Sequence, residues 1–193
     1  MRSGLVRNKI DIIIGITGTN GAGKGTVVEY LVEKGFTHYS MSGVIIEEIK
    51  RRGMPMNRDN TRLVGNDLRK THGPAYLVET NYERATQAGG DAIIEALRAI
   101  GEAEFLKEHA VSLLAVDADR RIRYERITGR AGALDQVTFE HFSEQEDREL
   151  TGTDIWDMNI AGVMAMADYT LTNDGTLEAL HAQVDEILKK ITK

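Results

Sequence analysis

A glycine-rich segment near the beginning of the chain is the feature that most restricts how it can fold. Residues 15–26 read GITGTNGAGKGT, and the β-branched run IDIIIGI, Ile10–Ile16, leads into them. The segment that follows, TVVEYLVEK at Thr26–Lys34, places its apolar residues at helical spacing and ends at a glycine. A buried strand, a glycine-bent loop with a lysine near its end and a helix together form the context of a phosphate-binding (Walker A) loop.

The chemistry of such a loop lies mainly in its backbone. Glycines let successive N–H groups point inward at phosphate oxygens, and the N-terminus of the following helix favours negative charge at the same place. Lys24 would then reach the β- and γ-phosphates. The alternative is an ordinary glycine-rich turn whose lysine faces solvent. The loop residues expected to contact a nucleotide are Gly18, Asn20, Gly21, Ala22, Gly23, Lys24, Gly25 and Thr26.

The rest of the chain alternates short apolar segments with longer helical ones. Further strands are expected at Thr37–Ser40, Asp91–Ala96, Val111–Val116 and Ala167–Thr172. Further helices are expected at Gly43–Arg52, Asn60–Lys70, Ala75–Ala88, Arg121–Thr128, Phe139–Leu150 and Leu177–Ile191. This alternation predicts an α/β fold in which helices cover both faces of a parallel sheet. Residues 1–193 contain no internal repeat or linker and are interpreted as one domain.

Composition and charge exclude several classes of function. The chain has 193 residues, of which 41% are hydrophobic and 28% charged, as in globular rather than disordered proteins. A net charge of −6 argues against general nucleic-acid binding, and the lack of cysteine excludes disulfides and thiol catalysis. The five histidines are too scattered to suggest a zinc site. The charged N-terminus and the absence of a long apolar run predict no signal peptide, no membrane contact and a cytoplasmic location.

The residues after Lys24 add a resemblance to known enzymes. Gly25 follows the lysine and the hydroxyl comes one place later, at Thr26, so that the loop reads GKGT. This resembles the adenylate kinase group of nucleoside monophosphate kinases. The resemblance implies that Thr26 contacts the nucleotide phosphates close to Mg²⁺, with ATP as the phosphoryl donor.

The expected third strand closes with an acid, and an arginine follows it. Ligands of open α/β sheets lie at the carboxyl ends of the strands, so Glu95 and Arg98 should face the phosphate loop. Acid-x-x-Arg at this place is similar to the pattern of nucleoside monophosphate kinases. The likeness implies that Glu95 holds a magnesium-bound water and that Arg98 clamps the acceptor phosphate. The alternative is a helix-capping Glu95 and a solvated Arg98, although an acid that closes a buried strand is costly to bury without a use.

The segment ERITGR, residues 125–130, resembles the start of the mobile lid in adenylate kinases. By that likeness Arg126 lies against the adenine or the phosphates, and Arg130 enters when a short lid, about 129–137, closes. Arg148, on the helix that follows the lid, could add positive charge from the far side of the lid. The alternative for any one of these arginines is a solvated helix face. The resemblance thus implies four catalytic side chains: Lys24, Arg98, Arg126 and Arg130.

The turn NDGT, Asn173–Thr176, is similar to a loop of adenylate and dephospho-CoA kinases that contacts adenine through its backbone. Asp174 and Gly175 are therefore candidate nucleotide contacts. The same turn can also be a simple connection in which Thr176 caps the last helix, and the two interpretations are compatible.

The acceptor side resembles the same kinases only in part. YSMSG, Tyr39–Gly43, is similar to the opening of their acceptor-nucleotide helix, so the acceptor-binding segment is expected at about 41–88. The acid and arginine that follow in those kinases are missing here. Glu102 falls where adenylate kinases carry a glutamine that reads AMP, and a carboxylate, which only accepts hydrogen bonds, disfavours adenine there. Candidates for the missing arginine are Arg51, Arg58, Arg62 and Arg69.

Gly15–Lys193 as a whole resembles a group of small archaeal and bacterial P-loop kinase-like proteins related to adenylate and dephospho-CoA kinases. The resemblance implies a three-layer α/β/α P-loop NTPase fold with five parallel strands in the order 2-3-1-4-5. It also implies transfer of the γ-phosphoryl group of Mg²⁺-bound ATP to a nucleoside monophosphate-type acceptor. The expected partners are small-molecule nucleotides, and the protein is expected to be a monomer or a homodimer.

Two other functions remain open from the sequence. The C-terminal resemblance favours dephospho-CoA as an alternative acceptor, and its ribose hydroxyl calls for a general base such as Asp11 or Glu47. A non-enzymatic ATP-binding switch or assembly module is the alternative from another class, with the acidic segment Glu140–Glu149 as a docking face. Such a module would bind ATP and hydrolyse it slowly, whether or not an acceptor is present.

Overall fold

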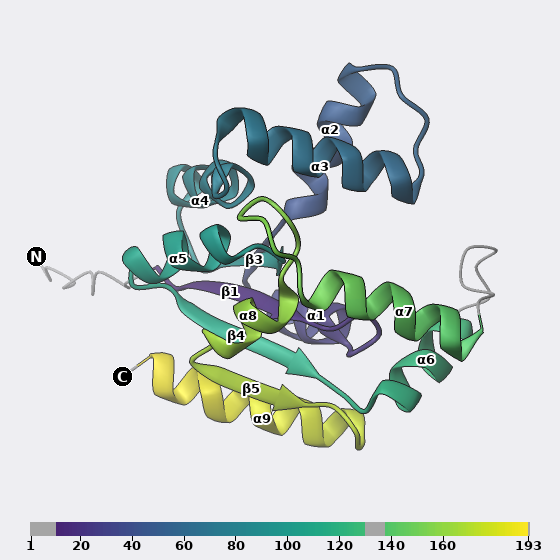
Figure 1. Ribbon diagram of the computed structural model, residues 1–193. Helices are drawn as coiled ribbons and strands as arrows, with labels where there is room; N and C mark the ends of the chain where they lie inside the picture. The colour runs from purple at the N-terminus through teal and green to yellow at the C-terminus, as the bar shows by residue number, and fades with distance from the viewer. Residues whose placement is uncertain (1–10, 130–137, 193) are drawn as a thin grey trace, which may run out of the picture.

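A five-stranded sheet forms the centre of the molecule in the computed structural model, which describes residues 11–129 and 138–192 (Figure 1). The strands are β1 (Ile13–Gly18), β2 (Thr37–Ser40), β3 (Ala92–Leu97), β4 (Ser112–Asp117) and β5 (Tyr169–Thr172). They run parallel in the order β2-β3-β1-β4-β5. The predicted α/β fold and the strand order 2-3-1-4-5 are therefore confirmed.

Helices cover both faces of the sheet and extend beyond one end of it (Figure 1). Within the described residues they are α1 (Lys24–Glu33), α2 (Met41–Arg51), α3 (Arg58–His72), α4 (Tyr76–Ala88), α5 (Ile100–Glu108), α6 (Arg120–Thr128), α7 (Phe139–Leu150), α8 (Ile160–Ala165) and α9 (Leu177–Ile191). Helices α2 and α3 stand out from the layers at the top of the view, with α4 beside them. We call α2 to α4, residues 41–88, the arm.

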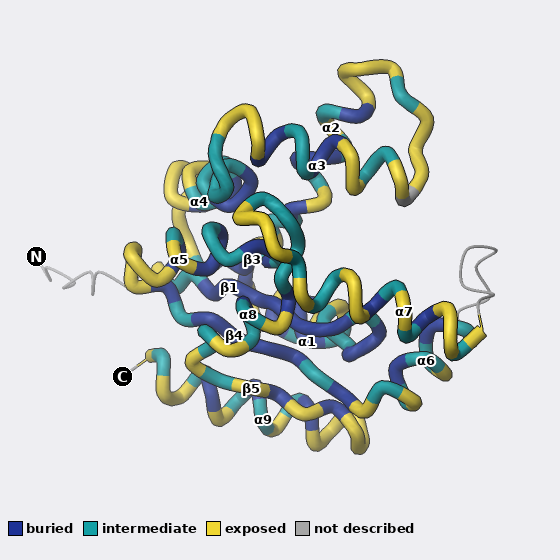
Figure 2. The backbone as a smooth tube through the Cα atoms, viewed as in Figure 1, coloured by how far each residue is buried: buried dark blue, intermediate teal, exposed yellow. Residues whose placement is uncertain are grey.

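The alternation of side chains along the strands produces two separate hydrophobic cores. Ile93 and Leu114 face one core, with side chains of α1 and α9, whereas their neighbours Ile94 and Leu113 face the other, with α5, α8 and the arm. All four side chains are at most 1% exposed. Figure 2 shows the buried residues concentrated along the strands and the exposed ones along the outer edge of the arm. A parallel sheet buried on both faces explains why the strands read as continuous apolar runs.

Two helices were not predicted, α5 and α8. Helix α8 has six residues and includes a glycine, so it lacks the length over which helical spacing becomes visible. Helix α5 begins where Glu102 accepts hydrogen bonds from the backbone N–H groups of Arg98 and Ala99, which is a capping arrangement that local periodicity does not reveal. Among the described residues, no helix is long and apolar enough to span a membrane.

Candidate active site

The glycine-rich loop joins β1 to α1 at the carboxyl edge of the sheet, as the sequence predicts. Strand β1 ends at Gly18 and α1 begins at Lys24. Gly18 has a φ of +137°, and a Cβ on it would collide with the carbonyl oxygen of Val116 in the neighbouring strand β4, so no other residue fits. The first turn of α1 contains no acidic residue, and no side chain caps it. Its N–H groups therefore remain available for an anion.

Lys24 lies over this loop, half-buried. Its Nζ donates hydrogen bonds to the carbonyl oxygens of Gly18 and Thr19, both at 2.8 Å. Burial, and then the positive charge of Arg98, lower the pKa of Lys24 to about 8, although the carboxylates of Glu95 and Glu149 oppose the shift. Two of the predicted site residues, Arg98 and Glu95, thus lie within electrostatic reach of the lysine. A phosphate group bound in the loop would raise the pKa of Lys24 again.

Glu95 is positioned by β3, between Ile16 of β1 and Ser40 of β2. One carboxylate oxygen lies 3.4 Å from Nε2 of His38. Burial alone would raise the pKa of Glu95, but the hydrogen bond from His38 and the charges of Lys24 and Arg98 outweigh burial and hold that pKa below its usual value. An ionised carboxylate and the hydroxyl of Thr26, in the first turn of α1, are the hard oxygen ligands that suit Mg²⁺.

Arg98 follows β3 and is held by its backbone and its side chain. Its N–H donates to Glu102 at 2.8 Å, and its carbonyl oxygen accepts from the N–H of Asn159 at 2.7 Å. The guanidinium Nη1 lies 3.4 Å from Oε2 of Glu149 and 3.6 Å from Sδ of Met158. The side chain is 35% exposed, so it can still reach a ligand.

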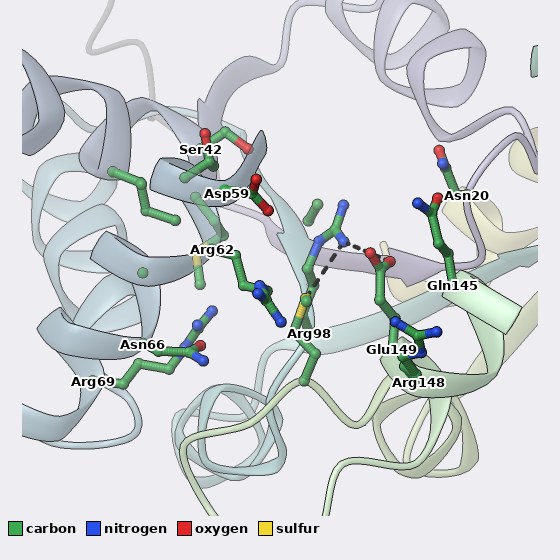
Figure 3. Close-up of a pocket in the computed structure, with 16 residues that line it drawn as sticks. Asn20, Ser42, Asp59, Arg62, Asn66, Arg69, Arg98, Gln145, Arg148 and Glu149 are labelled. Carbon is green, nitrogen blue, oxygen red and sulfur yellow. Dashed lines mark hydrogen bonds and ion pairs between the residues drawn. The ribbon is translucent and has the colours of Figure 1, made fainter. Parts of the chain in front are cut away.

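A cavity of about 460 Å³ opens beside Arg98, between the arm and α7 (Figure 3). It begins at Asn20 of the glycine-rich loop and extends to α2 and α3. Figure 3 shows arginines entering from different elements: Arg62 and Arg69 from α3, Arg98 from the end of β3 and Arg148 from α7. Cationic side chains from three elements around one cavity make it suited to an anionic ligand.

Two of the four candidates for the missing acceptor arginine, Arg62 and Arg69, line this cavity. Arg51 instead pairs with Glu48 at 2.6 Å, and its side chain is 73% exposed. The side chain of Arg58 lies outside the described part of the structure. The proposed bases for a hydroxyl acceptor are placed elsewhere: Glu47 pairs with Arg84, and Asp11 precedes β1 at the opposite edge of the sheet. Asp59 contributes a carboxylate to the cavity that the sequence did not single out.

Arg126 and the NDGT turn meet beside the glycine-rich loop. Nη2 of Arg126 donates to the carbonyl oxygen of Asn173 at 2.8 Å, while its buried Nη1 has no hydrogen-bond partner among the described residues. Asp174 accepts from the N–H of Asp119 at 2.7 Å, and Gly175 is exposed. Thr176 caps α9. The turn is therefore both a cap and a neighbour of the loop, so the two interpretations of its sequence hold together.

Sequence reasoning missed two residues that support the loop. Arg123 is 4% exposed, pairs with the buried Glu146 of α7 and lies with Nη1 3.4 Å from the carbonyl oxygen of Asn20. Its position four residues before the buried Ile127, on one helix face, was an available signal. Asp117 closes β4 and accepts a hydrogen bond from Oγ1 of Thr19 at 2.7 Å. An acid that ends a buried strand could have identified it, whereas Glu95, expected to close its strand, lies two residues before the end of β3 at Leu97.

Part of the predicted site lies outside the described residues. Arg130 and most of the expected lid, 130–137, belong to this part. Within the described residues, no group of three or more histidine, aspartate or glutamate side chains could hold a metal ion. A divalent ion at Thr26 and Glu95 would therefore need further oxygen ligands from a bound phosphate.

Sequence comparison finds relatives along nearly the whole chain. A family model described as "AAA domain" matches residues 14–151. UPF0200 protein TK1334 of Thermococcus kodakarensis is 31% identical over 191 residues, covering 93% of this chain and all of that protein. UPF0200 protein MmarC7_0527 of Methanococcus maripaludis is 30% identical over 185 residues, covering 94% of this chain and 98% of that protein.

Solved structures share the fold at lower identity. TT1252 from Thermus thermophilus has a TM-score of 0.64 at 21% identity and covers 96% of this chain and all of its own. Shikimate kinase from Acinetobacter baumannii, in complex with shikimate, has a TM-score of 0.58 at 17% identity, with 95% and 94% covered. Dephospho-CoA kinase from Campylobacter jejuni has a TM-score of 0.55 at 12% identity, with 95% and 98% covered. At these identities the likeness concerns the fold, which is that of P-loop kinases.

Proposed function

Because the chain belongs to the UPF0200 family, with an AAA domain over residues 14–151, we propose that it is a kinase that transfers the γ-phosphoryl group of ATP to a nucleoside monophosphate-type acceptor. The observation that carries the proposal is the cavity that begins at the glycine-rich loop and collects Arg62, Arg69, Arg98 and Arg148. A loop for a triphosphate and an arginine-lined space beside it are the two subsites that such a transfer requires. A cytoplasmic location and a monomer or homodimer are parts of the same proposal.

On the donor side, Gly18–Thr26 would hold the triphosphate through backbone N–H groups, with Lys24 on the β- and γ-phosphates. Arg126 and the backbone of Asp174 and Gly175 would border the adenine. Thr26 and Glu95 would hold Mg²⁺, which, when bound, withdraws charge from the phosphate oxygens. These assignments use an uncapped helix N-terminus and a buried Nη1 of Arg126 without a partner among the described residues, both of which suit a ligand.

On the acceptor side, Arg62, Arg69 and Arg148 would bind an anionic acceptor in the space between the arm, 41–88, and α7. An acceptor phosphate oxygen attacks the γ-phosphorus, the bond from that phosphorus to the bridging oxygen breaks, and ADP leaves. A phosphate dianion needs no general base. Lys24 and Arg98 would neutralise the charge on the transferred group, and Arg126 and Arg130 are proposed to assist them.

Asp59 favours a second candidate, in which the acceptor is a hydroxyl group, as in dephospho-CoA. This side chain lines the cavity and stands in the first turn of α3. A carboxylate there could accept the proton that a hydroxyl loses during attack. The variant Asp59→Asn distinguishes the two candidate acceptors. It should strongly slow transfer to a hydroxyl and only weakly slow transfer to a phosphate.

A screen of ADP release tests the proposal. The protein with Mg²⁺ and ATP is incubated with each ribo- and deoxyribonucleoside monophosphate and with dephospho-CoA, and phosphorus NMR identifies the product. We expect ADP release to depend on one class of acceptor. We also expect Lys24→Ala to lower the rate by orders of magnitude while circular dichroism shows an intact fold. Slow ATP hydrolysis that no acceptor changes would instead support the non-enzymatic switch or assembly module.

A further inference from the structure

The buried carboxylate of Glu102 holds two of the arginines that line the cavity. Glu102 lies in the first turn of α5, and its side chain is 0% exposed. Oε1 accepts hydrogen bonds from Nε and Nη2 of Arg69, at 2.9 and 2.7 Å. Oε2 accepts from the backbone N–H groups of Arg98 and Ala99, at 2.8 and 3.0 Å. Both oxygens are therefore used inside the protein.

These contacts join α3, which lies 33 residues earlier in the chain, to the segment that connects β3 with α5. Arg69 belongs to α3 of the arm, Arg98 follows β3 of the sheet, and Glu102 opens α5. The carbonyl oxygen of Arg98 is also held, by the N–H of Asn159, so the peptide groups on both sides of its Cα are fixed. The direction in which the Arg98 side chain leaves the backbone is therefore set from α5 and from the start of α8.

Arg69 is similarly restricted. It is 4% exposed, and two of its three guanidinium nitrogens are used on Glu102. Nη1 lies near Gly65, where an added Cβ would be 3.5 Å from it, and both residues line the cavity. The ion pair thus fixes how far the cationic side chain reaches into the acceptor space.

We infer that Glu102 is a positioning residue for phosphoryl transfer, which sets Arg98 and Arg69 at a fixed separation. The inference rests on the proposed function, in which Arg98 faces the transferred group and Arg69 the acceptor. It has a consequence for specificity, because Glu102 occupies the place where the resemblance to adenylate kinases implies a reader of AMP. With both oxygens engaged, Glu102 does not read the acceptor, and that role falls to lining residues of the arm such as Ser42, Asp59 and Asn66.

The variant Glu102→Gln tests whether Glu102 positions the two arginines or only fills buried space. A glutamine has one acceptor oxygen, and the charged Arg69 attracts it, so the NH₂ group would face the N–H groups of Arg98 and Ala99. The backbone of Arg98 should then shift. We expect kcat to fall by about 10²-fold, the effect of a misplacement near 1 Å, and the acceptor KM to rise, while the Kd for ATP changes less than about twofold. Glu104→Gln, an exposed carboxylate on the same helix, is the matched control and should change neither.

Two double variants give readouts that a purely structural role would not move. In Arg69→Gln/Glu102→Gln, the amide oxygen introduced at position 102 can turn to the backbone of Arg98, while its NH₂ group bonds to the amide introduced at position 69. We expect kcat to recover to within about fivefold of the wild type and the acceptor KM to stay high. In an Arg98→Ala background, Glu102→Gln should lower kcat little further, since Arg98, the arginine that faces the transferred group, is gone. A Glu102→Gln enzyme with wild-type kcat, or an undiminished loss in the Arg98→Ala background, would overturn the inference.

Binding of inorganic phosphate tests the positioning role without turnover. If the wild type transfers phosphate to no acceptor, the proposed function fails. The positioning role of Glu102 is then tested separately, by NMR of the Arg69 Nε–H and of the Arg98 amide. We expect both signals to exchange slowly with solvent and to shift on addition of phosphate. In Glu102→Gln we expect the Arg98 amide, which loses its acceptor, to exchange rapidly with solvent and the phosphate affinity to fall about tenfold. Unchanged signals and unchanged affinity in this variant would refute the role of Glu102. The doubly neutral Arg69→Gln/Glu102→Gln protein replaces the single variant if the latter does not fold.

Discussion

The side-chain amide of Asn173 occupies the space that a side chain on Gly23 would need. Its Nδ2 donates to the carbonyl oxygen of Ala22 at 2.8 Å, and a Cβ built on Gly23 collides with the same nitrogen. Gly23 also has a φ of +100°, in the region that favours glycine. The last turn of the glycine-rich loop is therefore shaped by a residue that lies 151 positions after Ala22 in the chain, directly after β5.

Asn173→Ala should weaken ATP binding. The substitution leaves the carbonyl oxygen of Ala22 without its hydrogen bond and frees the loop from β5, so we expect the Kd for ATP to rise about tenfold, measured by calorimetry. Gln183→Ala is the matched control, because it removes an amide that bonds to the backbone of Thr172 and does not touch the loop. An unchanged Kd in a folded Asn173→Ala protein would show that the loop keeps its shape unaided.

The lowered pKa of Lys24 predicts that nucleotide binding takes up a proton. In the free protein the pKa of Lys24 is about 8, and bound phosphates should return it toward its ordinary value. Near pH 9 the free lysine is mostly neutral and the bound one charged, so binding takes up about one proton, and affinity falls roughly tenfold per pH unit above pH 8. Calorimetry in buffers of different ionisation enthalpy measures the uptake. Lys24→Met should show none of it.

The same shift has a consequence for the stability of the unliganded protein. Between pH 8 and 10.5 the unfolded chain still binds the Lys24 proton, while the folded chain has released it. The contribution of Lys24 to the free energy of unfolding therefore rises with pH across this window and is unfavourable below it. Denaturant titrations of the wild type and Lys24→Met, compared at each pH, isolate this contribution. A difference between the two proteins that does not change from pH 7.5 to 10 would contradict the lowered pKa.

Glu146 should be essential for the stability of α7. It pairs with the buried Arg123, whose pKa is lowered by burial, and it also bonds to Arg120 at 2.8 Å. Glu146→Gln removes the nearest counter-charge of a buried guanidinium and leaves it only the more distant Asp117, at 3.9 Å from Nε, so we expect a loss of about 3 kcal/mol in urea unfolding. The exposed pair of α7, Glu144 with Arg148, supplies the control. Glu144→Gln should cost less than about 0.5 kcal/mol.

The fold was predictable to the extent that local patterns determine it. The predicted bounds of β2, α7 and α9 agree with the structure, since Thr138 and Thr176 cap the two helices with their own side chains. Helix α5 was not predicted because Glu102, which caps it, is a buried carboxylate whose charge is balanced by Arg69 on another element. A helix built on tertiary contacts leaves little trace in local periodicity.

The candidate site likewise has a part that local sequence predicts and a part that depends on tertiary packing. The glycine-rich loop and Glu95 follow from residues that are close in sequence, so their place at the sheet edge could be predicted. The choice of Arg62 and Arg69 could not, because it depends on how the arm packs against α5. Arg123 was not predicted because it stands among several arginines. In such a run, a buried, paired side chain differs from a solvated one only by sharing a helix face with buried apolar residues.

Gly65→Ala should impair acceptor binding without harming the fold. A Cβ on this residue of α3 would lie 3.0 Å from Cδ1 of Ile45 and 3.5 Å from Nη1 of Arg69, inside the proposed acceptor cavity. Alanine is favoured over glycine in a helix by about 1 kcal/mol, and this gain opposes the cost of moving the end of the Ile45 side chain by a few tenths of an ångström, so we expect the free energy of unfolding to change by less than about 1 kcal/mol. We expect the acceptor KM to rise about fivefold or more and the ATP KM to stay constant, because less room remains beside Arg69. Gly43→Ala, in α2 with nothing within 4 Å of its added Cβ, should gain the same helix propensity and leave both KM values unchanged. If Gly65→Ala and Gly43→Ala behave alike in steady-state kinetics, the acceptor does not bind between α2 and α3.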